Sequence, residues 1–254
     1  FNIDEEELKK AFVKDDNIKA VIAVNIAGNI PNLDVIREIS KKHGAKLILD
    51  NCDGFCGIYH GKPVESFADV VATSFHAAHI ITMGEGGAVF TSDPKVAERV
   101  RQYRDWGREG GDDTSTKLIS LPEDYPKRYS YPVLGFNLKP LELQAAVGIV
   151  QFNKLGKFRA VRTRNFQLLK KVFSKYPDHF KTMRTEKSAD PCWFSFPILV
   201  IGSRKKFVKC LEENNIETRP IFSGNILKHP IGQADSLGKC SNADEILHKG
   251  VFIG

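Results

Sequence analysis

The sequence lacks the features that mark a membrane-spanning, secreted or disulfide-stabilised protein. No apolar run approaches the roughly 18 residues that a membrane span requires. The opening segment FNIDEEELKK carries acidic residues where a signal peptide has a basic stretch and an apolar core. The cysteines number only five, and none of them forms a Cys-x-x-Cys pair, which excludes a disulfide framework and a zinc ribbon. We expect a protein of the reducing cytoplasm with no membrane partner.

Charge of one sign is not concentrated anywhere in the chain. Lysine and arginine number 37 against 31 aspartate and glutamate residues, a net charge of +6, and many basic residues stand at helical spacing. This pattern indicates a solvated surface and no nucleic-acid partner, although a mild positive excess suits an anionic small molecule such as a nucleotide. With 254 residues, of which 42% are hydrophobic, the chain is long enough for a large and a small α/β domain.

Short apolar runs alternate with a helical pattern in the first half of the chain. The runs 20–25, 45–50, 68–75 and 87–92 are β-branched and nearly continuous in apolar residues, which is typical of strands buried on both faces. The segment 33–44 has apolar residues at helical spacing, a lysine-rich last turn and a terminal glycine. The order strand, helix, strand predicts an α/β fold with a mainly parallel sheet.

The second half predicts a long loop, a bridging helix and a smaller domain. The polar stretch 108–132 is rich in glycine and proline and is interpreted as a loop. From Pro140 to Phe173 the apolar spacing favours one long helix. Strand, helix and strand are then predicted over 193–200, 203–215 and 216–222.

These elements predict a large domain over residues 1–153 and a small C-terminal α/β domain over 154–254, joined by the long helix. The chain begins at Phe1 without a methionine and stops just after the apolar run VFIG. We therefore expect an internal piece of a longer protein, in which both domains are incomplete.

Polar side chains gather where two of the predicted strands end. Asp50 closes the run 45–50 and Asp53 follows within one turn, a pattern that is equally typical of a plain turn rich in Asx residues. Ligands of open parallel sheets bind at the carboxyl ends of the strands, because the loops there carry polar groups that the strands hold rigidly. This edge of the sheet is the first candidate site.

The second candidate segment is TSFHAAHIITMGEGG, residues 73–87. Its strand ends in hydroxyl residues, and hydroxyls with free backbone N–H groups suit a phosphate. His76 and His79 follow; with Asp50 and Asp53 they are alternatively metal ligands, although HxxH spacing without a further ligand motif gives little support. A third alternative is that both histidines only pack and form hydrogen bonds. The GEGG turn does not match G-x-G-x-x-G, so a dinucleotide fingerprint is not supported.

Three segments of the chain, in order, resemble one known family. They read ILDNCDGFCG, ADVVATSFHAAHIITMGEGGAVF and LGFNLKPLELQAAVGIVQFNKL. They are similar to the DegT-type sugar aminotransferases and dehydratases, which use pyridoxal or pyridoxamine phosphate on an aspartate-aminotransferase-like fold of type I. The resemblance covers nearly the whole chain and implies that fold and that cofactor.

The resemblance also implies which residues bind the cofactor. Asp50 would pair with the pyridine nitrogen and keep it protonated, so that the ring acts as an electron sink. Asp53 would lie beside the ring on its O3′ side, and Ser74 would contact the phosphate. Asn137 would reach the phosphate of the cofactor in a neighbouring subunit, which implies a homodimer with shared active sites.

His79 stands where the family's aminotransferases, with the motif SFHxxK, carry the lysine that forms a Schiff base. An imidazole cannot form that bond, but it is a competent base near neutral pH. The same replacement marks the family's nucleotide-sugar 3-dehydratases. The resemblance therefore implies removal of the C3 hydroxyl of a nucleotide-linked 4-keto-6-deoxyhexose, in deoxysugar biosynthesis of the O-antigen or lipopolysaccharide type, with His79 as the base.

The chain departs from the CDP-sugar branch that it otherwise resembles in one segment. Those enzymes carry a cysteine cluster just after the DWGR motif, whereas residues 105–116 read DWGREGGDDTST and contain no cysteine. Cys52 and Cys56 alone are too few for a cluster. We therefore expect no [2Fe-2S] cluster and no metal, and L-glutamate becomes the expected amine donor.

A last set of candidates lies near the C-terminus. Arg219, Asn225 and His229 resemble the family's substrate-side loop, where they would hold a diphosphate or the carboxylate of glutamate. Two alternatives to a dehydratase stay open: a nucleotide-sugar aminotransferase of the same family, and a non-catalytic relative that keeps only the fold. The residue at position 79 discriminates the dehydratase from the aminotransferase, whereas cofactor binding without turnover of any keto sugar would favour the non-catalytic relative.

Overall fold

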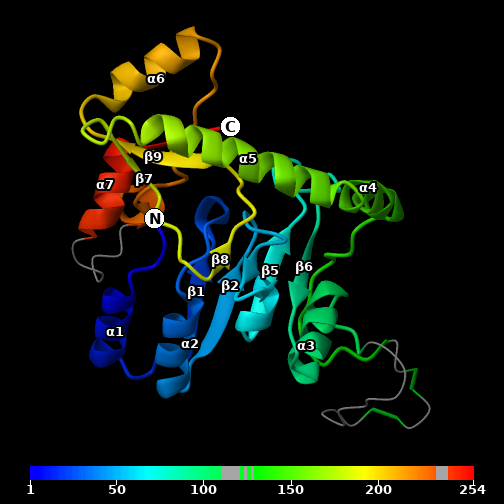
Figure 1. The fold of residues 1–254 in the computed structure, drawn as a ribbon. Helices are drawn as coiled ribbons and strands as arrows, with labels where there is room; N and C mark the ends of the chain where they lie inside the picture. Colours follow the sequence, from blue (N-terminus) through cyan, green and yellow to red (C-terminus); the bar gives the residue numbers. More distant parts are fainter. Residues whose placement is uncertain (110–120, 123–124, 127–128, 233–239) are drawn as a thin grey trace.

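A four-stranded sheet forms the centre of the molecule (Figure 1). The computed structural model describes residues 1–109, 121–122, 125–126, 129–232 and 240–254. The strands lie in the order β1-β2-β5-β6 and span Ala20–Val24, Lys46–Asp50, Val70–Ser74 and Gly87–Phe90. β1, β2 and β5 are parallel, and β6 is antiparallel to β5. The predicted α/β fold with a mainly parallel sheet is confirmed, and each strand falls within its predicted run.

The register brings the carboxyl ends of the parallel strands to one edge. Asp50 pairs with Val24 on one side and with Ala72 on the other. The hydrogen bonds continue one residue beyond the strands, from Asn25 N to Asp50 O (2.9 Å) and from Asn51 N to Ala72 O (2.8 Å). The residues that follow β2 and β5 therefore leave the sheet from fixed, neighbouring positions.

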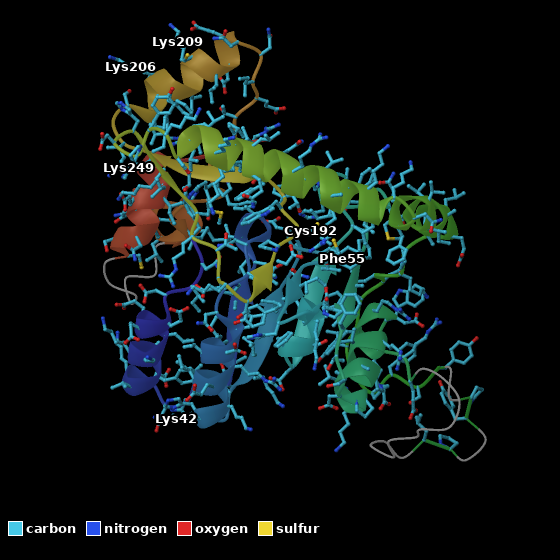
Figure 2. All side chains as sticks on the ribbon, viewed as in Figure 1. Lys42, Phe55, Cys192, Lys206, Lys209 and Lys249 are labelled. Atoms are coloured by element: carbon cyan, nitrogen blue, oxygen red, sulfur yellow. The ribbon has the colours of Figure 1, made fainter. Side chains whose placement is uncertain are left out.

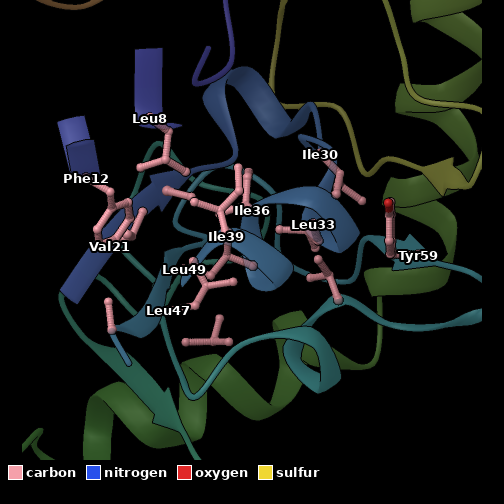
Figure 3. Packing of buried hydrophobic residues seen from close by; sticks show 14 residues of the cluster. Leu8, Phe12, Val21, Ile30, Leu33, Ile36, Ile39, Leu47, Leu49 and Tyr59 are labelled. Atoms are coloured by element: carbon pink, nitrogen blue, oxygen red, sulfur yellow. The ribbon is translucent and has the colours of Figure 1, made fainter. Parts of the chain in front are cut away.

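Helices α1 (Glu5–Lys14) and α2 (Leu33–Lys42) pack on β1 and β2 (Figure 3). α2 begins at a cap, where the side chain of Asn32 accepts a hydrogen bond from Val35 N (3.2 Å). Its apolar stripe is buried with the inward side chains of the strands, namely Leu33, Ile36, Ile39, Val21, Leu47 and Leu49. Since each fully buried aliphatic side chain of this size contributes about 1.5–3 kcal/mol, this cluster holds the strand ends in place.

Short elements connect the strands. The 3-10 helix η1 (Ile26–Gly28) follows β1. Between β2 and β5 lie β3, β4 and the 3-10 helix η2 (Ile58–Tyr59, Lys62–Pro63 and Val64–Phe67). β3 also pairs with β8 (Ala189–Asp190), which comes from the second half of the chain. This pairing ties the two halves together beside the sheet.

The predicted long helix is divided in two, so the expectation of one continuous helix was wrong. α3 (Pro94–Arg104) is followed by α4 (Glu142–Phe152) and α5 (Leu155–Phe173). Lys154 N bonds to Gln151 O (2.9 Å), three residues back, instead of continuing the four-residue pattern. Apolar spacing runs unbroken through this tightened turn, which is why the sequence pattern does not reveal it.

The C-terminal part has a second, antiparallel sheet and its own hydrophobic cluster. The strands β10-β9-β7 span Gly250–Ile253, Phe196–Val200 and Phe180–Thr182, and the sheet is accompanied by α6 (Arg204–Glu213), α7 (Ser241–Lys249), η4 (Ile226–Lys228) and η5 (Pro230–Gly232). Trp193 stacks on Phe166 of α5, with ring centroids 3.5 Å apart. These rings bury α5 against the second sheet.

The strand predicted over 216–222 is absent, and that expectation was wrong. Within it only Arg219 forms a bridge, with Phe252. Pro220 has no N–H to donate to a ladder, and Phe222 adopts a left-handed backbone with φ of 45°. The strand predicted over 193–200 begins at Phe196, while the helix predicted over 203–215 is confirmed as α6.

Parts of two predictions fall on residues 110–120, 123–124 and 127–128, which lie outside the described residues. They concern the loop 108–132 and the cysteine-free segment 105–116. Across the described part of the chain, none of the helices has both the length and the apolar composition needed to cross a membrane. All five cysteines are described and none forms a disulfide.

Candidate active site

The ends of β2 and β5 place a carboxylate and a hydroxyl at the same edge of the sheet. Asp50 is the last residue of β2 and is half-buried, and its Oδ1 accepts a hydrogen bond from Cys52 N (3.1 Å). Ser74 is the last residue of β5, and its Oγ accepts one from His76 N (3.1 Å). The sequence prediction that both strands end in polar groups at one edge is therefore consistent with their positions in the sheet.

A second carboxylate, that of Asp53, lies under the loop that follows β1. Its side chain is buried, and its Oδ2 accepts a hydrogen bond from Ala27 N (3.0 Å). Ala27 has a left-handed backbone with φ of 53°, which aims this N–H into the site. Burial raises the pKa of Asp53 to about 6, and the charge of Asp50 adds to this, while the bond from Ala27 opposes it.

The imidazole of His79 faces this carboxylate. Its Nε2 lies 3.7 Å from Asp53 Oδ1, close enough to attract but longer than a hydrogen bond. Burial lowers the pKa of His79, and the neighbouring His76 lowers it further, while Asp50 opposes the shift. At neutral pH the ring is therefore uncharged and ready to accept a proton.

The other ring nitrogen of His79 is in an unusual position. Within the described part of the chain, Nδ1 is buried and has no hydrogen-bond partner. The ring lies beside the ring of His76, with centroids 5.8 Å apart, and beside that of Phe194, with centroids 5.9 Å apart. A buried polar atom without a partner costs about 1–3 kcal/mol, and such atoms are typical of functional sites.

A buried amide network supports the turn that carries both carboxylates. Asn25 Nδ2 donates to Asn51 Oδ1 (2.6 Å), and Asn51 Nδ2 donates to Glu65 Oε1 (3.0 Å). A Cβ atom on Gly54 would lie 2.6 Å from Asn51 Oδ1, so only glycine fits there. Sequence reasoning missed Asn25, although an asparagine at the end of a buried apolar strand is a usable signal.

Asn137 lies in a different part of the fold. It is exposed, in the chain between α3 and α4, and bridges to Asp105 at the end of α3. Across the described residues it forms no hydrogen bond with Asp50, Ser74 or His79. Within one chain Asn137 is therefore joined to the end of α3 and not by hydrogen bonds to the strand-end residues.

None of the described hydrogen bonds joins the C-terminal candidates to the strand-end residues, and two of these candidates are engaged in local structure. Asn225 is buried; its Nδ2 donates to Asp244 Oδ1 (2.8 Å) and its Oδ1 accepts from Leu227 N (3.0 Å). His229 Nε2 lies 2.9 Å from Ser223 O. Arg219 is exposed and pairs with the adjacent Glu217. Only Arg219 presents its charge to solvent.

The alternative that these histidines and aspartates bind a metal ion is not supported by the part of the chain that the structure describes. No group of three or more histidine, cysteine, aspartate or glutamate side chains there could hold a metal ion. The remaining arrangement has a neutral imidazole, two carboxylates and a hydroxyl at the carboxyl edge of a parallel sheet. His79 can accept a proton, and the carboxylate of Asp53 can stabilise the positive charge that the imidazole then carries. At the strand ends, the hydroxyl of Ser74 can bind an anionic group and the carboxylate of Asp50 a cationic one.

Comparison with known proteins identifies relatives over the whole chain. The profile of the DegT/DnrJ/EryC1/StrS aminotransferase family matches residues 1–254. The lipopolysaccharide biosynthesis protein RfbH of Salmonella typhimurium is 35% identical, over 100% of this chain and 62% of its own length. A dTDP-4-dehydro-2,6-dideoxy-D-glucose 3-dehydratase of Saccharopolyspora spinosa is 34% identical, over 100% of this chain and 58% of its length. The chain thus spans about three fifths of these relatives.

A solved structure shows the same fold. The GDP-4-keto-6-deoxy-D-mannose-3-dehydratase of E. coli, with bound hydrated PLP, superposes with a TM-score of 0.86 at 28% identity, over 100% of this chain and 66% of that one. The expected resemblance to type I fold enzymes is therefore confirmed.

Proposed function

Because the chain belongs to the DegT/DnrJ/EryC1/StrS aminotransferase family, we propose that it forms the catalytic part of a nucleotide-sugar 3-dehydratase that uses pyridoxal or pyridoxamine phosphate. Its substrate would be a nucleotide-linked 4-keto-6-deoxyhexose, from which it removes the C3 hydroxyl in deoxysugar biosynthesis. One observation carries the proposal: the family's Schiff-base position is occupied by His79, whose Nε2 faces Asp53 at 3.7 Å. Two of the similar proteins are named as 3-dehydratases, which supports the same assignment.

The residues at the strand ends fit this cofactor. Asp50 would hold a proton on the pyridine nitrogen, Ser74 would donate to the phosphate, and Asp53 would lie beside the ring. The buried Nδ1 of His79 has no partner among the described residues, and such atoms are typical of functional sites. When bound, the cofactor supplies an electron sink conjugated to the substrate.

His79 would perform the proton transfers. A neutral imidazole would take a proton at Nε2 from the carbon that carries the cofactor's amine, and the carboxylate of Asp53 at 3.7 Å would stabilise the imidazolium that results. The same imidazolium would then give its proton to the C3 hydroxyl as the C3–O bond breaks, so that this oxygen leaves as water. General acid–base assistance of this kind contributes roughly 10²–10⁴-fold. Burial of the ring keeps bulk water away from the transferred proton.

A second subunit would complete the site. α4 has no buried residue, and the chain around it exposes large apolar side chains at Leu134, Phe136, Leu138, Leu141 and Leu143. An apolar surface of this extent on a globular protein is typical of a protein interface. In a homodimer with shared active sites, Asn137, which lies in this surface, would reach the partner's cofactor phosphate.

The remaining parts of the proposal concern substrate, donor and domains. Arg219 would hold the diphosphate or the carboxylate of glutamate, while Asn225 and His229 would fix the turn that follows it. L-glutamate would regenerate the amine form of the cofactor. The division into residues 1–153 and 154–254 is supported by the two separate hydrophobic clusters. The enzyme would act in the cytoplasm, where nucleotide sugars are made.

Two alternatives give different products. An aminotransferase of the same family would return a sugar that carries an amine at C4. A non-catalytic relative would bind the cofactor without turning over any keto sugar. The dehydratase instead yields a sugar that has lost the C3 oxygen and kept the C4 ketone.

The test uses the full-length protein with pyridoxal phosphate. L-glutamate is expected to convert the aldehyde absorption band into that of the amine, and borohydride followed by mass analysis is expected to show no covalent adduct at position 79. A nucleotide-linked 4-keto-6-deoxyhexose should then lose its C3 oxygen. A product aminated at C4, or the absence of any product, would overturn the proposal.

A further inference from the structure

Phe194 belongs to a segment that two distant parts of the chain hold in place. Its N–H donates to Ala27 O (3.0 Å), in the loop after β1. Its carbonyl accepts a hydrogen bond from Arg162 Nη1 of α5 (2.8 Å), which also donates to Trp193 O (3.2 Å). The backbone of Phe194 is therefore fixed both to the helix and to the loop beside the active site.

The contact between this segment and the loop is unusually close. A Cβ atom on Gly28 would lie 2.3 Å from Cys192 O, and Gly28 has a φ of +87°, so only glycine permits the approach. In Figure 2 Cys192 is drawn between α5 and the tops of the strands, near Phe55. Phe55 in turn packs against Phe75, which directly follows β5. The segment thus lies over the edge of the sheet that carries the site.

The ring of Phe194 packs beside the imidazole of His79. The two ring centroids are 5.9 Å apart at an interplanar angle of 57°. Phe194 also contacts Phe252 of β10, with centroids 6.0 Å apart. The ring therefore packs both on a strand of the second sheet and on the proposed base, and a displacement from either would break a packed contact.

A single residue, Ala27, links this ring to the acidic partner of His79. The N–H of Ala27 binds Asp53 Oδ2 (3.0 Å), and its carbonyl binds Phe194 N (3.0 Å). Asp53 and Phe194 are thus both positioned by the same residue, and both lie beside the imidazole. The groups near the ring are Asp50 at the end of β2, Asp53 in the turn after it, His76 from its own segment, and Phe194, which brings no charge.

We propose that Phe194 is a positioning residue for His79: its ring covers the imidazole, excludes water from Nδ1 and keeps Nε2 directed at Asp53. An apolar ring offers Nδ1 no hydrogen bond, so the buried nitrogen stays unpaired and the neutral form is favoured. For catalysis this inference rests on the proposed role of His79 as the base. The positioning of the ring can be measured without any turnover.

The first measurement is an NMR titration of the His79 imidazole in the cofactor-free, full-length protein. Phe194→Leu removes the aromatic cover, so water reaches the ring and the pKa of His79 is expected to rise toward its ordinary value. Phe194→Tyr keeps the ring and should restore the wild-type titration. Phe207→Leu removes a ring that packs in the second cluster, against Phe173 and Phe180, and should leave the His79 titration unchanged.

Kinetics give the second readout. In Phe194→Leu we expect kcat to fall roughly 10-fold to 100-fold with KM little changed, since the base is misplaced while substrate contacts remain. The pKa on the acidic side of the pH profile of kcat/KM should rise, as the pKa of His79 does in the NMR titration. Phe194→Tyr should recover both.

The outcomes separate this inference from the proposed function. An unchanged His79 titration in Phe194→Leu would overturn the positioning role. If that variant does not fold, Arg162→Gln, which frees the carbonyls of Trp193 and Phe194, is expected to shift the titration upward, and a wild-type titration there would overturn the role equally. A shifted titration in a protein that eliminates no hydroxyl from any keto sugar would uphold the positioning and reject the dehydratase.

Discussion

Two polar clusters of this molecule contain the same kinds of residue and use them differently. The strand-end cluster consists of Asp50, Asp53, Ser74 and His79, and the turn cluster of Ser223, Asn225, His229 and Asp244. In the turn cluster, Asn225 Nδ2 binds Asp244 Oδ1 at 2.8 Å and His229 Nε2 lies 2.9 Å from Ser223 O. In the strand-end cluster, His79 Nδ1 is buried without a partner among the described residues, and burial raises the pKa of Asp53 to about 6.

The difference indicates which cluster is built for chemistry. Polar groups that satisfy one another stabilise the fold, whereas buried groups left unpaired or with shifted pKa values cost stability and persist where a ligand or a reaction uses them. By this criterion the strand-end cluster is the site and the turn cluster is a brace for α7. Variants of the strand-end cluster should therefore lower activity more than stability, and variants of the turn cluster should lower stability more than activity.

The largest expected effect is that of His79→Asn. Loss of the proposed base should lower kcat by roughly 10²–10⁴-fold, because the asparagine amide cannot accept a proton near neutral pH. Stability should change little or rise, since a buried unpaired nitrogen is removed. The measurement is the rate of C3 deoxygenation by the full-length protein together with its denaturant midpoint.

His179→Asn is the matched control for that experiment. His179 is an exposed histidine beside β7, and the same substitution there should leave both rate and stability at wild-type values. If His79→Asn reacted as fast as this control, His79 would not be the base and the comparison between the clusters would fail.

Asn225→Ala should produce the largest loss of stability. The change removes two hydrogen bonds of a buried side chain and leaves Asp244 Oδ1 without the amide. We expect the free energy of unfolding to fall by about 2–3 kcal/mol. Urea unfolding measures it; a loss below the error of that method would show that the turn cluster does not brace the fold.

The contrast between the clusters also shows what sequence reasoning could and could not find. Asp50 and Ser74 were located by their positions at the ends of buried apolar runs, because a parallel sheet brings such ends together whatever the side chains are. The strands and α2 followed from the same periodicity. Ala27 N, which holds Asp53, and Phe194, which covers His79, come from residues distant in sequence, and nothing local in the chain marks either contact.

The two errors in secondary structure have a related cause. Apolar spacing predicted one helix through Asn153 and Lys154 and a strand over 216–222. In the first case a tightened turn interrupts the hydrogen bonds without changing the apolar pattern. In the second, Pro220 and the left-handed Phe222 prevent a ladder that the β-branched residues favour. The spacing of apolar residues indicates which side chains are buried, but it does not indicate where the backbone hydrogen bonds of a helix or strand end.

Asp53→Asn should raise stability while lowering activity. The folded-state pKa of Asp53, about 6, lies above its unfolded value near 3.9. Between these values the folded protein holds more protons than the unfolded one, so wild-type stability falls as the pH rises through that window. The asparagine side chain does not titrate, so the variant has no such dependence, and its amide oxygen can still accept from Ala27 N. We expect the variant to be more stable by about 3 kcal/mol at pH 8 and equal to wild type below pH 4.

Urea unfolding of the cofactor-free protein at several pH values tests this prediction. Asp178→Asn, the same substitution at an exposed aspartate, serves as the matched control. A stability difference between Asp53→Asn and wild type that stays constant from pH 4 to pH 8 would contradict the raised pKa. The expected loss of kcat, measured on the same samples, would show that the carboxylate serves the reaction at the expense of stability.

The smallest effect is expected for Arg219→Gln, the one C-terminal candidate whose charge faces solvent. Its side chain is 65% exposed and pairs only with the neighbouring Glu217 among the described ion pairs, so stability should change by less than about 0.5 kcal/mol. If the guanidinium holds a diphosphate or a carboxylate, KM for that compound should rise about 5-fold with kcat unchanged, because such a contact is equal in the ground and transition states. Lys187→Gln, at another exposed cation, is the control. Equal KM values in both variants would remove Arg219 from the proposed substrate site and leave the strand-end cluster without support from the C-terminal candidates.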